Sequence, residues 1–206
     1  MVFSASMRSL TVGVLALQGD VSEHIEATKS AGALLKIPIA VVSVRIAGDL
    51  ETLDALIIPG GESSTLQKLC EREGMFQKMK KVKNIFGTCA GAILLAKEVL
   101  HKTSDQKTLA LMNIEVDRNA YGRQNESFER VIETEFGQMN AVFIRAPKIR
   151  TVGKKLKVLA RNGTEIVAYE ERDRGRYYLA TCFHPEYTSG VFHKYFLEQT
   201  LREVVG

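Results

Sequence analysis

The stretch that decides the fold is NIFGTCAGAILLA, residues 84–96, in which a short apolar strand runs into Gly-x-Cys-x-Gly and an apolar helix follows at once. This pattern predicts a nucleophile elbow with sulfur in place of oxygen, where a strained turn holds Cys89 clear at the strand end. Gly87 and Gly91 allow the strand and the helix to pass closely. The start of the helix at Ala90 favours the thiolate form of the cysteine, which is the attacking species.

Length and composition are typical of a soluble globular protein with an ample core. The chain has 206 residues, of which 45% are hydrophobic and 25% are charged. Its net charge of +4 comes without a dense Lys/Arg block, so nucleic-acid binding is not expected. Apolar stretches are too short to cross a bilayer, and the N-terminus does not have the pattern of a signal peptide. Three cysteines without a Cys-x-x-Cys pair predict free thiols in a reducing cytoplasm.

Strands and helices alternate in the first half of the chain. Strands are expected over 10–17, 37–44, 55–58 and 85–88, and helices over about 21–31 and 63–81. Because the connections are short, this alternation predicts a parallel sheet that is covered by helices on both faces.

The ends of these helices have recognisable capping residues. Asp20 and Glu23 are predicted to form a capping box at the start of the first helix, and Gly32 is predicted to be its C-terminal cap. Ser63 or Ser64 is predicted to cap the second helix.

The second half is richer in strands, which are expected over 111–116, 127–133, 141–144, 157–160, 166–170 and 177–183, before a final helix over about 191–204. Repeats, low-complexity stretches and linkers are absent from the sequence. We therefore expect one α/β domain over 1–206 with a mostly parallel central sheet, and a disordered N-terminal extension over residues 1–9.

A thiolate nucleophile needs a base, and the base needs a group that orients it. His184 lies just past an apolar strand in Cys182–Glu186 (CFHPE). Residues two apart at a strand end project to the same side, so Glu186 can fix the tautomer of His184 as the third member of a triad. The alternatives are that Cys89 is a buried small hydrophobe and that His-Pro-Glu is a strand-ending turn. The presence of both segments in one chain favours the triad.

The other three histidines are predicted to be surface or packing residues. His24 lies on an amphipathic helix, His101 follows the end of a helix and His193 lies in the last helix. His, Cys, Asp and Glu residues show no metal-ligand spacing along the sequence, so neither a metal nor a cofactor is expected.

Two further features lie at strand ends. The loop 59–65 (PGGESST) closes a strand where open parallel sheets bind ligands, and its backbone N–H groups, with that of Ala90, are suited to hold an oxyanion. The alternative is a plain loop that caps the next helix, and the loop is not a Walker A motif. Arg118 and Arg145 each end a strand-like segment and can pair with a substrate carboxylate, although the residues alone favour surface salt bridges.

Six motifs follow one another along the chain: LQGDVSEH (17–24), PGGESST (59–65), GTCAG (87–91), RNAYGRQ (118–124), FIRAP (143–147) and FHPE (183–186). Together they resemble the class I, or triad, glutamine amidotransferase family. More narrowly, they resemble the glutaminase subunits of pyridoxal 5′-phosphate synthase, over almost the whole chain. GTCAG and FHPE are shared by the wider class, whereas LQG, RNAYGRQ and FIRAP point to the vitamin B6 subunits.

The resemblance implies hydrolysis of L-glutamine to glutamate and ammonia, with the ammonia passed to a separate barrel-shaped synthase subunit. Carried onto this sequence, it makes Cys89 the nucleophile and lets His184 and Glu186 complete the triad. It implies a glutamine site lined by Gly61, Glu62, Ser63, Arg118, Ile144 and Arg145, and an oxyanion hole formed by the backbone N–H groups of Gly61 and Ala90.

Three other interpretations remain. The chain could be a glutaminase subunit of another pathway, such as histidine or anthranilate synthesis, but segments 118–124 and 144–147 argue against this. It could be a cysteine-elbow hydrolase or protein-repair protein, which would not need the His-Pro-Glu segment. It could be a non-enzymatic binding subunit, which an intact triad argues against. If it is the glutaminase, we expect partner docking to reorganise the Gly60–Gly61 loop, so that the oxyanion hole forms only in the complex.

Overall fold

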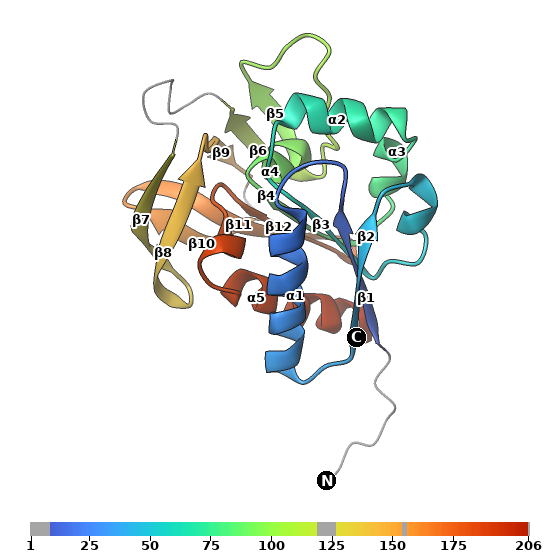
Figure 1. The fold of residues 1–206 in the computed structure, drawn as a ribbon. Helices are drawn as coiled ribbons and strands as arrows, with labels where there is room; N and C mark the ends of the chain where they lie inside the picture. Colours follow the sequence, from blue (N-terminus) through green and yellow to red (C-terminus); the bar gives the residue numbers. More distant parts are fainter. Residues whose placement is uncertain (1–8, 119–126, 154–155, 206) are drawn as a thin grey trace.

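The computed structural model describes residues 9–118, 127–153 and 156–205. Twelve strands are found in this part of the chain: β1 Leu10–Leu15, β2 Ile39–Val44, β3 Ala55–Ile58, β4 Asn84–Thr88, β5 Ala96–Leu100, β6 Met112–Asp117, β7 Ser127–Thr134, β8 Gly137–Ile144, β9 Lys148–Val152, β10 Leu156–Asn162, β11 Glu165–Asp173 and β12 Arg176–Thr181. Nine of them form one sheet in the order β2-β1-β3-β4-β12-β11-β10-β7-β8, and β5-β6-β9 form a smaller one (Figure 1).

The large sheet has a parallel half and an antiparallel half. The neighbours β2-β1-β3-β4-β12 are all parallel. The strands β11, β10, β7 and β8 continue the sheet in antiparallel fashion. The expected α/β fold with a parallel centre is therefore confirmed, and the strand-rich second half supplies the antiparallel extension together with one strand, β12, of the centre.

Helices cover both faces of the sheet: α1 Val21–Leu35, α2 Ser63–Arg72, α3 Phe76–Met79, α4 Ala90–Leu95 and α5 Val191–Val205, with short 3-10 turns η1 Ala47–Leu50 and η2 Pro185–Tyr187. On β3, Leu56 and Ile58 face α2, α3, α4 and the small sheet, whereas Ala55 and Ile57 face α1 and α5. Alternate side chains of a strand point to opposite faces, so β3 contributes to two apolar cores. Figure 1 shows α1 beside α5 on one side and α2, α3 and α4 on the other.

Two features of the first half differ from expectation. The helix expected over 63–81 is two helices, because Gly74 at φ 66 ends α2 and the chain turns into α3. The C-terminal cap predicted at Gly32 is wrong: α1 continues to Leu35 and ends at Lys36 in the left-handed region. Gly32 lies inside the helix, where a Cβ would come within 2.3 Å of Ile39 Cδ1, so packing rather than capping explains the glycine.

Two of the strands were not predicted from the sequence. β5 follows α4 without a connecting loop, and its Lys97 and Glu98 are both exposed, so it lacks the alternation that marks a half-buried strand. β9 is short and begins just after Pro147. Both strands pair with β6, which lies between them in the small sheet.

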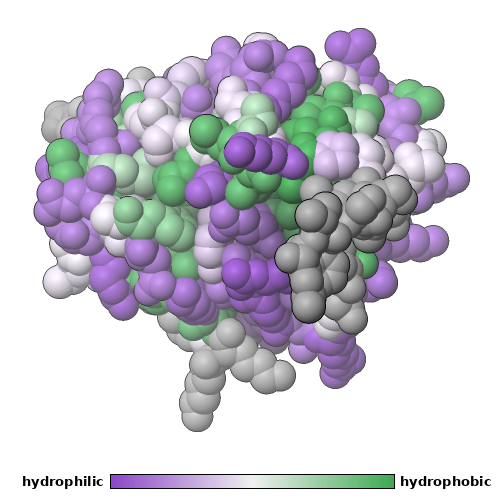
Figure 2. Space-filling model, turned by 90° about the horizontal axis from the view of Figure 1, so that it is seen from below, coloured by the Kyte–Doolittle hydropathy of each residue, from purple (hydrophilic) through white to green (hydrophobic). Residues whose placement is uncertain are grey.

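Seen from below, the surface has hydrophilic residues spread between hydrophobic ones (Figure 2). Among the described residues, none of the helices is both long enough and apolar enough to cross a membrane. The expected N-terminal extension falls on residues that lie outside the described part of the chain, apart from Ser9.

Candidate active site

The nucleophile elbow expected around Cys89 is present at the end of β4. Cys89 has φ 49 and ψ −103, a backbone conformation that non-glycine residues seldom adopt. Its N–H donates to Thr181 O on β12 at 2.8 Å, which ties the turn to the next strand. A Cβ on Gly87 would lie 2.5 Å from Gly91 C, and a Cβ on Gly91 would lie 2.1 Å from Ile58 O. Gly87 and Gly91 are therefore both required by close backbone packing.

His184 and Glu186 come together just beyond β12. Nδ1 of His184 lies 2.7 Å from Oε1 of Glu186, and the side chains are 3% and 0% exposed. Burial alone would raise the pKa of Glu186, but hydrogen bonds from His184 and His24 lower it to about 2. Glu186 is thus a buried carboxylate that remains ionised at neutral pH.

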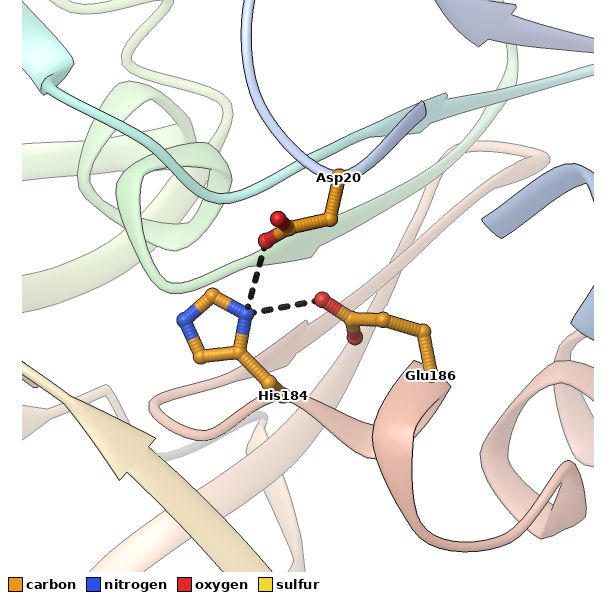
Figure 3. Close-up of side chains that lie close together, drawn as sticks. All are labelled: Asp20, His184 and Glu186. Carbon is orange, nitrogen blue, oxygen red and sulfur yellow. Dashed lines mark hydrogen bonds and ion pairs between the residues drawn. The ribbon is translucent and has the colours of Figure 1, made fainter. Parts of the chain in front are cut away.

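Asp20 is a second carboxylate on the same ring nitrogen (Figure 3). Its Oδ2 lies 3.2 Å from Nδ1 of His184, and its Oδ1 accepts a hydrogen bond from the Tyr187 hydroxyl at 2.8 Å. The predicted capping box with Glu23 is wrong, because the Asp20 side chain makes no cap hydrogen bond and is used here instead. The hydrogen bond with His184 is the largest effect on Asp20, and it lowers the pKa of that carboxyl despite partial burial. Sequence analysis missed this role, although Asp20 follows β1 at the sheet edge where the other site residues lie.

The charge of His184 follows from these neighbours. Burial lowers the pKa of the imidazole, but the hydrogen bonds with Asp20, Cys89 and Glu186 outweigh it and raise the pKa to about 12. The ring is therefore an imidazolium at neutral pH. The two carboxylates take up Nδ1, so Nε2 is the ring nitrogen left to face Cys89 and a reacting group beside it.

Replacing Asp20 by Asn should lower the pKa of His184, because it removes one of the negative partners of the imidazolium. If the imidazolium is the catalytic acid, the basic limb of the profile of kcat/KM against pH should move to lower pH. Tyr187→Phe keeps the Asp20 carboxylate and should move that limb less. Steady-state kinetics of glutamine hydrolysis across the pH range checks this, and identical basic limbs for Asp20→Asn and the unmodified protein would contradict it.

The loop after β3 lies against this histidine. A Cβ on Gly60 would come within 2.5 Å of Cε1 of His184, and a Cβ on Gly19 would lie 2.0 Å from Gly60 O. Gly61 has φ 131 and packs on the Gln18 side chain. The segments LQGD (17–20) and PGGE (59–62), which are distant in sequence, therefore meet beside the imidazole ring of His184.

Glu62 begins α2, so the cap predicted at Ser63 or Ser64 is wrong. The Glu62 carboxylate accepts hydrogen bonds from the N–H groups of Ser64 at 3.1 Å and Thr65 at 2.7 Å. It also pairs with Arg118, whose Nη2 lies 3.0 Å from Oε1. Ser63 and Ser64 are already inside α2, and the two carboxylate oxygens of Glu62 satisfy two of the unpaired N–H groups at the start of the helix.

Arg118 and Ser63 share a further partner that sequence analysis missed. Gln106, which is buried, donates to Ser63 Oγ at 3.0 Å and accepts a short hydrogen bond from Arg118. Nothing in the motif pattern marked Gln106, because it lies in the irregular segment between β5 and β6. The rest of the Arg118–Gln124 motif lies outside the described residues.

Ile144 and Arg145 approach the site from β8. The Cys89 thiol donates to Ile144 O with an Sγ–O distance of 3.6 Å. Arg145 follows at φ 45 and is exposed. The structure thus brings Cys89, His184, Glu186 and Ile144 together at the carboxyl ends of the parallel strands, and it links Glu62, Ser63 and Arg118 to one another through Gln106 and an ion pair.

The remaining histidines were expected at the surface or in packing positions. His24 and His193 are fully buried and hydrogen-bonded to each other at 2.9 Å. His101 lies after strand β5 rather than after a helix, and its Nδ1 lies 3.0 Å from Asp117 Oδ1.

One group of side chains in the described part of the chain has the spacing to hold a metal ion. It consists of Asp20, His184 and Glu186, whose ligand atoms all lie within 4.8 Å of one another. The same atoms are accounted for by hydrogen bonds to Nδ1, which must carry a proton in the imidazolium. A protonated nitrogen is not a metal ligand, so we interpret the group as the support of a catalytic histidine.

An α/β sheet that carries a cysteine elbow beside a buried histidine–glutamate pair defines the class of the glutamine amidotransferases. A family model described as the SNO glutamine amidotransferase family matches residues 14–202, and the chain belongs to that family. It is 44% identical over 200 residues to the pyridoxal 5′-phosphate synthase subunit PdxT of Pyrococcus horikoshii, covering 93% of this chain and 100% of that protein. It is 46% identical over 202 residues to the subunit of the same name from Pyrobaculum arsenaticum, covering 92% and 97%.

A solved structure described as a glutamine amidotransferase superposes on this chain with a TM-score of 0.78. That protein is 44% identical in sequence, and the match covers 92% of this chain and 98% of the other. The fold and the family are therefore supported by independent comparisons.

Proposed function

We propose that this chain is the glutaminase subunit of a pyridoxal 5′-phosphate synthase, which hydrolyses L-glutamine to L-glutamate and ammonia. The observation that carries the chemistry is Cys89 on a strained elbow beside an imidazolium that two carboxylates hold in place. The pathway rests on the relatives named pyridoxal 5′-phosphate synthase subunit PdxT. Their similarity over nearly the full length of both chains favours this pathway over histidine or anthranilate synthesis.

In the proposed reaction the Cys89 thiolate attacks the side-chain amide carbon of glutamine. Negative charge develops on the carbonyl oxygen, and the backbone N–H groups of Gly61 and Ala90 stabilise it, each donor lowering the barrier by about 3 kcal/mol. His184 protonates the departing ammonia through Nε2, and the acyl group stays on sulfur as a thioester. His184 then takes a proton from water, which attacks the thioester and releases glutamate and the thiolate.

Glutamine recognition is assigned to the charged groups around the elbow. Glu62 would hold the substrate ammonium, and Arg118 or Arg145 would hold the α-carboxylate. Glu62 and Arg118 already pair with each other at 3.0 Å, so a substrate with both charges would meet a preformed pair of opposite sign. Ser63 and the Ile144 carbonyl would line the same site.

The ammonia is proposed to pass to a barrel-type synthase subunit in a larger complex. The site lies at the carboxyl ends of the parallel strands, where the Pro59–Gly61 loop closes over His184. A docked partner could reorient the Gly60–Gly61 peptide at little cost, since neither residue has a side chain. Three free cysteines, Cys70, Cys89 and Cys182, suit work in the reducing cytoplasm.

The test is ammonia release from glutamine by the purified chain, alone and mixed with a barrel-type pyridoxal 5′-phosphate synthase. We expect hydrolysis to rise on mixing, and we expect amide-15N glutamine to label the ring nitrogen of pyridoxal 5′-phosphate. If the synthase leaves the rate of glutamine hydrolysis unchanged, this would argue against coupling between the two subunits. Absence of hydrolysis both alone and with the synthase would refute the glutaminase proposal.

A further inference from the structure

A pair of buried histidines lies behind the triad carboxylate. His24 on α1 and His193 on α5 have no exposed surface, and Nδ1 of His24 lies 2.9 Å from Nε2 of His193. On its other side, Nε2 of His24 lies 3.3 Å from Oε1 of Glu186 and 3.1 Å from Oγ1 of Thr88. A chain of polar contacts therefore links His193 on α5, through His24 on α1, to Glu186, the residue that orients His184.

The contacts of the two rings indicate which nitrogens of His193 and His24 carry protons. Burial lowers the pKa of His193 to about 3, so His193 is neutral, with one donor and one acceptor nitrogen. Its Nδ1 has no hydrogen-bond partner among the described residues. An unpaired acceptor is tolerated in a protein interior better than an unpaired N–H, so this nitrogen is the unprotonated one. His193 then donates through Nε2 to His24, and His24 is left to donate through its own Nε2 toward Glu186 and Thr88.

We propose that His24 is a positioning residue of the triad: its Nε2–H lies between Thr88 Oγ1 and Glu186 Oε1 and so holds this carboxylate ionised and in place for His184. The inference rests on the proposed function, because it assigns a support to the same triad. Oε1 of Glu186 faces both rings, at 2.7 Å from His184 and 3.3 Å from His24, while Oε2 has no partner among the described residues. Without His24, the fully buried Glu186 carboxylate would keep only the His184 ring as a donor. Burial would then disfavour its ionised form.

Packing fixes the two rings in this arrangement. His24 meets Phe86 edge to face with ring centroids 6.4 Å apart, and His193 meets the same ring at 5.5 Å. Phe86 belongs to β4, the strand that ends at the elbow. The donor to Glu186 is therefore held by the same strand that presents the nucleophile.

Three variants separate hydrogen bonding from packing. His24→Leu removes both ring nitrogens but keeps an apolar side chain of moderate size. His24→Gln keeps an N–H donor near the position of Nε2. Thr28→Val is the matched control, because Thr28 is buried on the same helix and its hydroxyl donates to His24 O at 2.7 Å rather than to the triad.

In the complex with the synthase, we expect kcat for glutamine hydrolysis to fall about ten- to a hundred-fold in His24→Leu, as for the loss of one hydrogen bond to a charged group, with KM unchanged. His24→Gln should recover most of this loss, and Thr28→Val should resemble the unmodified protein. A packing role predicts the reverse order, because leucine suits an apolar site better than glutamine does. That reversed order would overturn the proposal.

Nitrogen NMR of the unmodified protein with 15N-labelled histidine gives a second readout, which does not depend on any variant folding. The proposal requires His24 to carry its proton on Nε2 and to have an unprotonated Nδ1. The opposite tautomer would leave Glu186 without this donor and would overturn the proposal.

Alkylation of Cys89 by iodoacetamide at neutral pH distinguishes failure of this inference from failure of the proposed function, because it involves no glutamine. We expect His24→Leu to be alkylated more slowly than the unmodified protein. If the unmodified protein is alkylated faster than His24→Leu but shows no glutamine hydrolysis, the proposed function fails while the effect of His24 on Cys89 stands. Equal alkylation rates for His24→Leu and the unmodified protein would overturn the role of His24.

Discussion

Cys89→Ala should abolish glutamine hydrolysis, with a fall in kcat on the order of a million-fold, as when the nucleophile of a triad is removed. The reason is that no other described group near the amide carbon could form the acyl intermediate: Cys182 is fully buried, and burial raises the pKa of its thiol far above neutrality. The measurement is ammonia release in the complex with the synthase, followed by mass spectrometry for the acylated protein. We expect an acyl adduct on the unmodified chain and none on the variant.

Binding to the synthase should survive this substitution. Cys89 is 5% exposed, so the change from sulfur to hydrogen alters little of the surface. Cys70→Ala is the matched control, since Cys70 is buried in the core between α2 and the sheet. It should keep glutamine hydrolysis while losing some stability. Full ammonia release by Cys89→Ala would contradict the mechanism.

Gly91→Ala should destabilise the protein by about 3 kcal/mol, at the upper end for an overpacked interior. A Cβ at Gly91 would lie 2.1 Å from Ile58 O, so the start of α4 must move away from β3. Alanine has the higher helix propensity, which would favour the variant by up to about 1 kcal/mol, so steric conflict must outweigh that gain. Denaturant unfolding measures the free energy, and glutaminase kinetics should show loss of activity because the elbow moves with the helix.

Gly48→Ala is the control for this prediction. Gly48 lies in η1, and a Cβ there would meet nothing closer than Ile46 Cδ1 at 4.0 Å. The same chemical change should therefore alter the free energy of unfolding by less than about 1 kcal/mol. A Gly91→Ala protein as stable as Gly48→Ala would mean that β3 and α4 can separate without cost.

The parts of the site that the sequence predicts are those set by local chain geometry. The elbow needs a strand, two glycines and a helix in unbroken order, and the structure has this arrangement around Cys89. His184 and Glu186 are two residues apart, so their contact is local, although the short turn η2 just past β12 makes it rather than the alternation of a strand. Four of the five parallel strands, β1, β3, β4 and β12, were likewise marked by short apolar runs, because strands buried on both faces must be largely apolar, whereas β2 is an edge strand with exposed residues.

Contacts between distant segments were not predictable in this way. Asp20 has the sequence context of a helix cap, and only the return of β12 to the middle of the sheet brings His184 within its reach. Glu62 was expected to bind substrate, but its carboxylate also caps α2, which no side-chain pattern distinguishes beforehand. His24 appeared to be a packing residue because its partners, Glu186 and His193, lie more than 160 positions later in the chain.

The position of β12 has a consequence for how the protein is made. β12 is the last strand among the described residues, yet it lies in the interior of the large sheet, paired with β4 on one side and β11 on the other. While the ribosome is still adding the final segment, β4 lacks this neighbour and the residues that will flank Cys89 have not yet emerged. Such late, long-range strand pairing is slow to form. The thiol therefore gains its imidazolium only after the chain has been synthesised through His184, so a chain that stops short of this residue carries an unactivated cysteine.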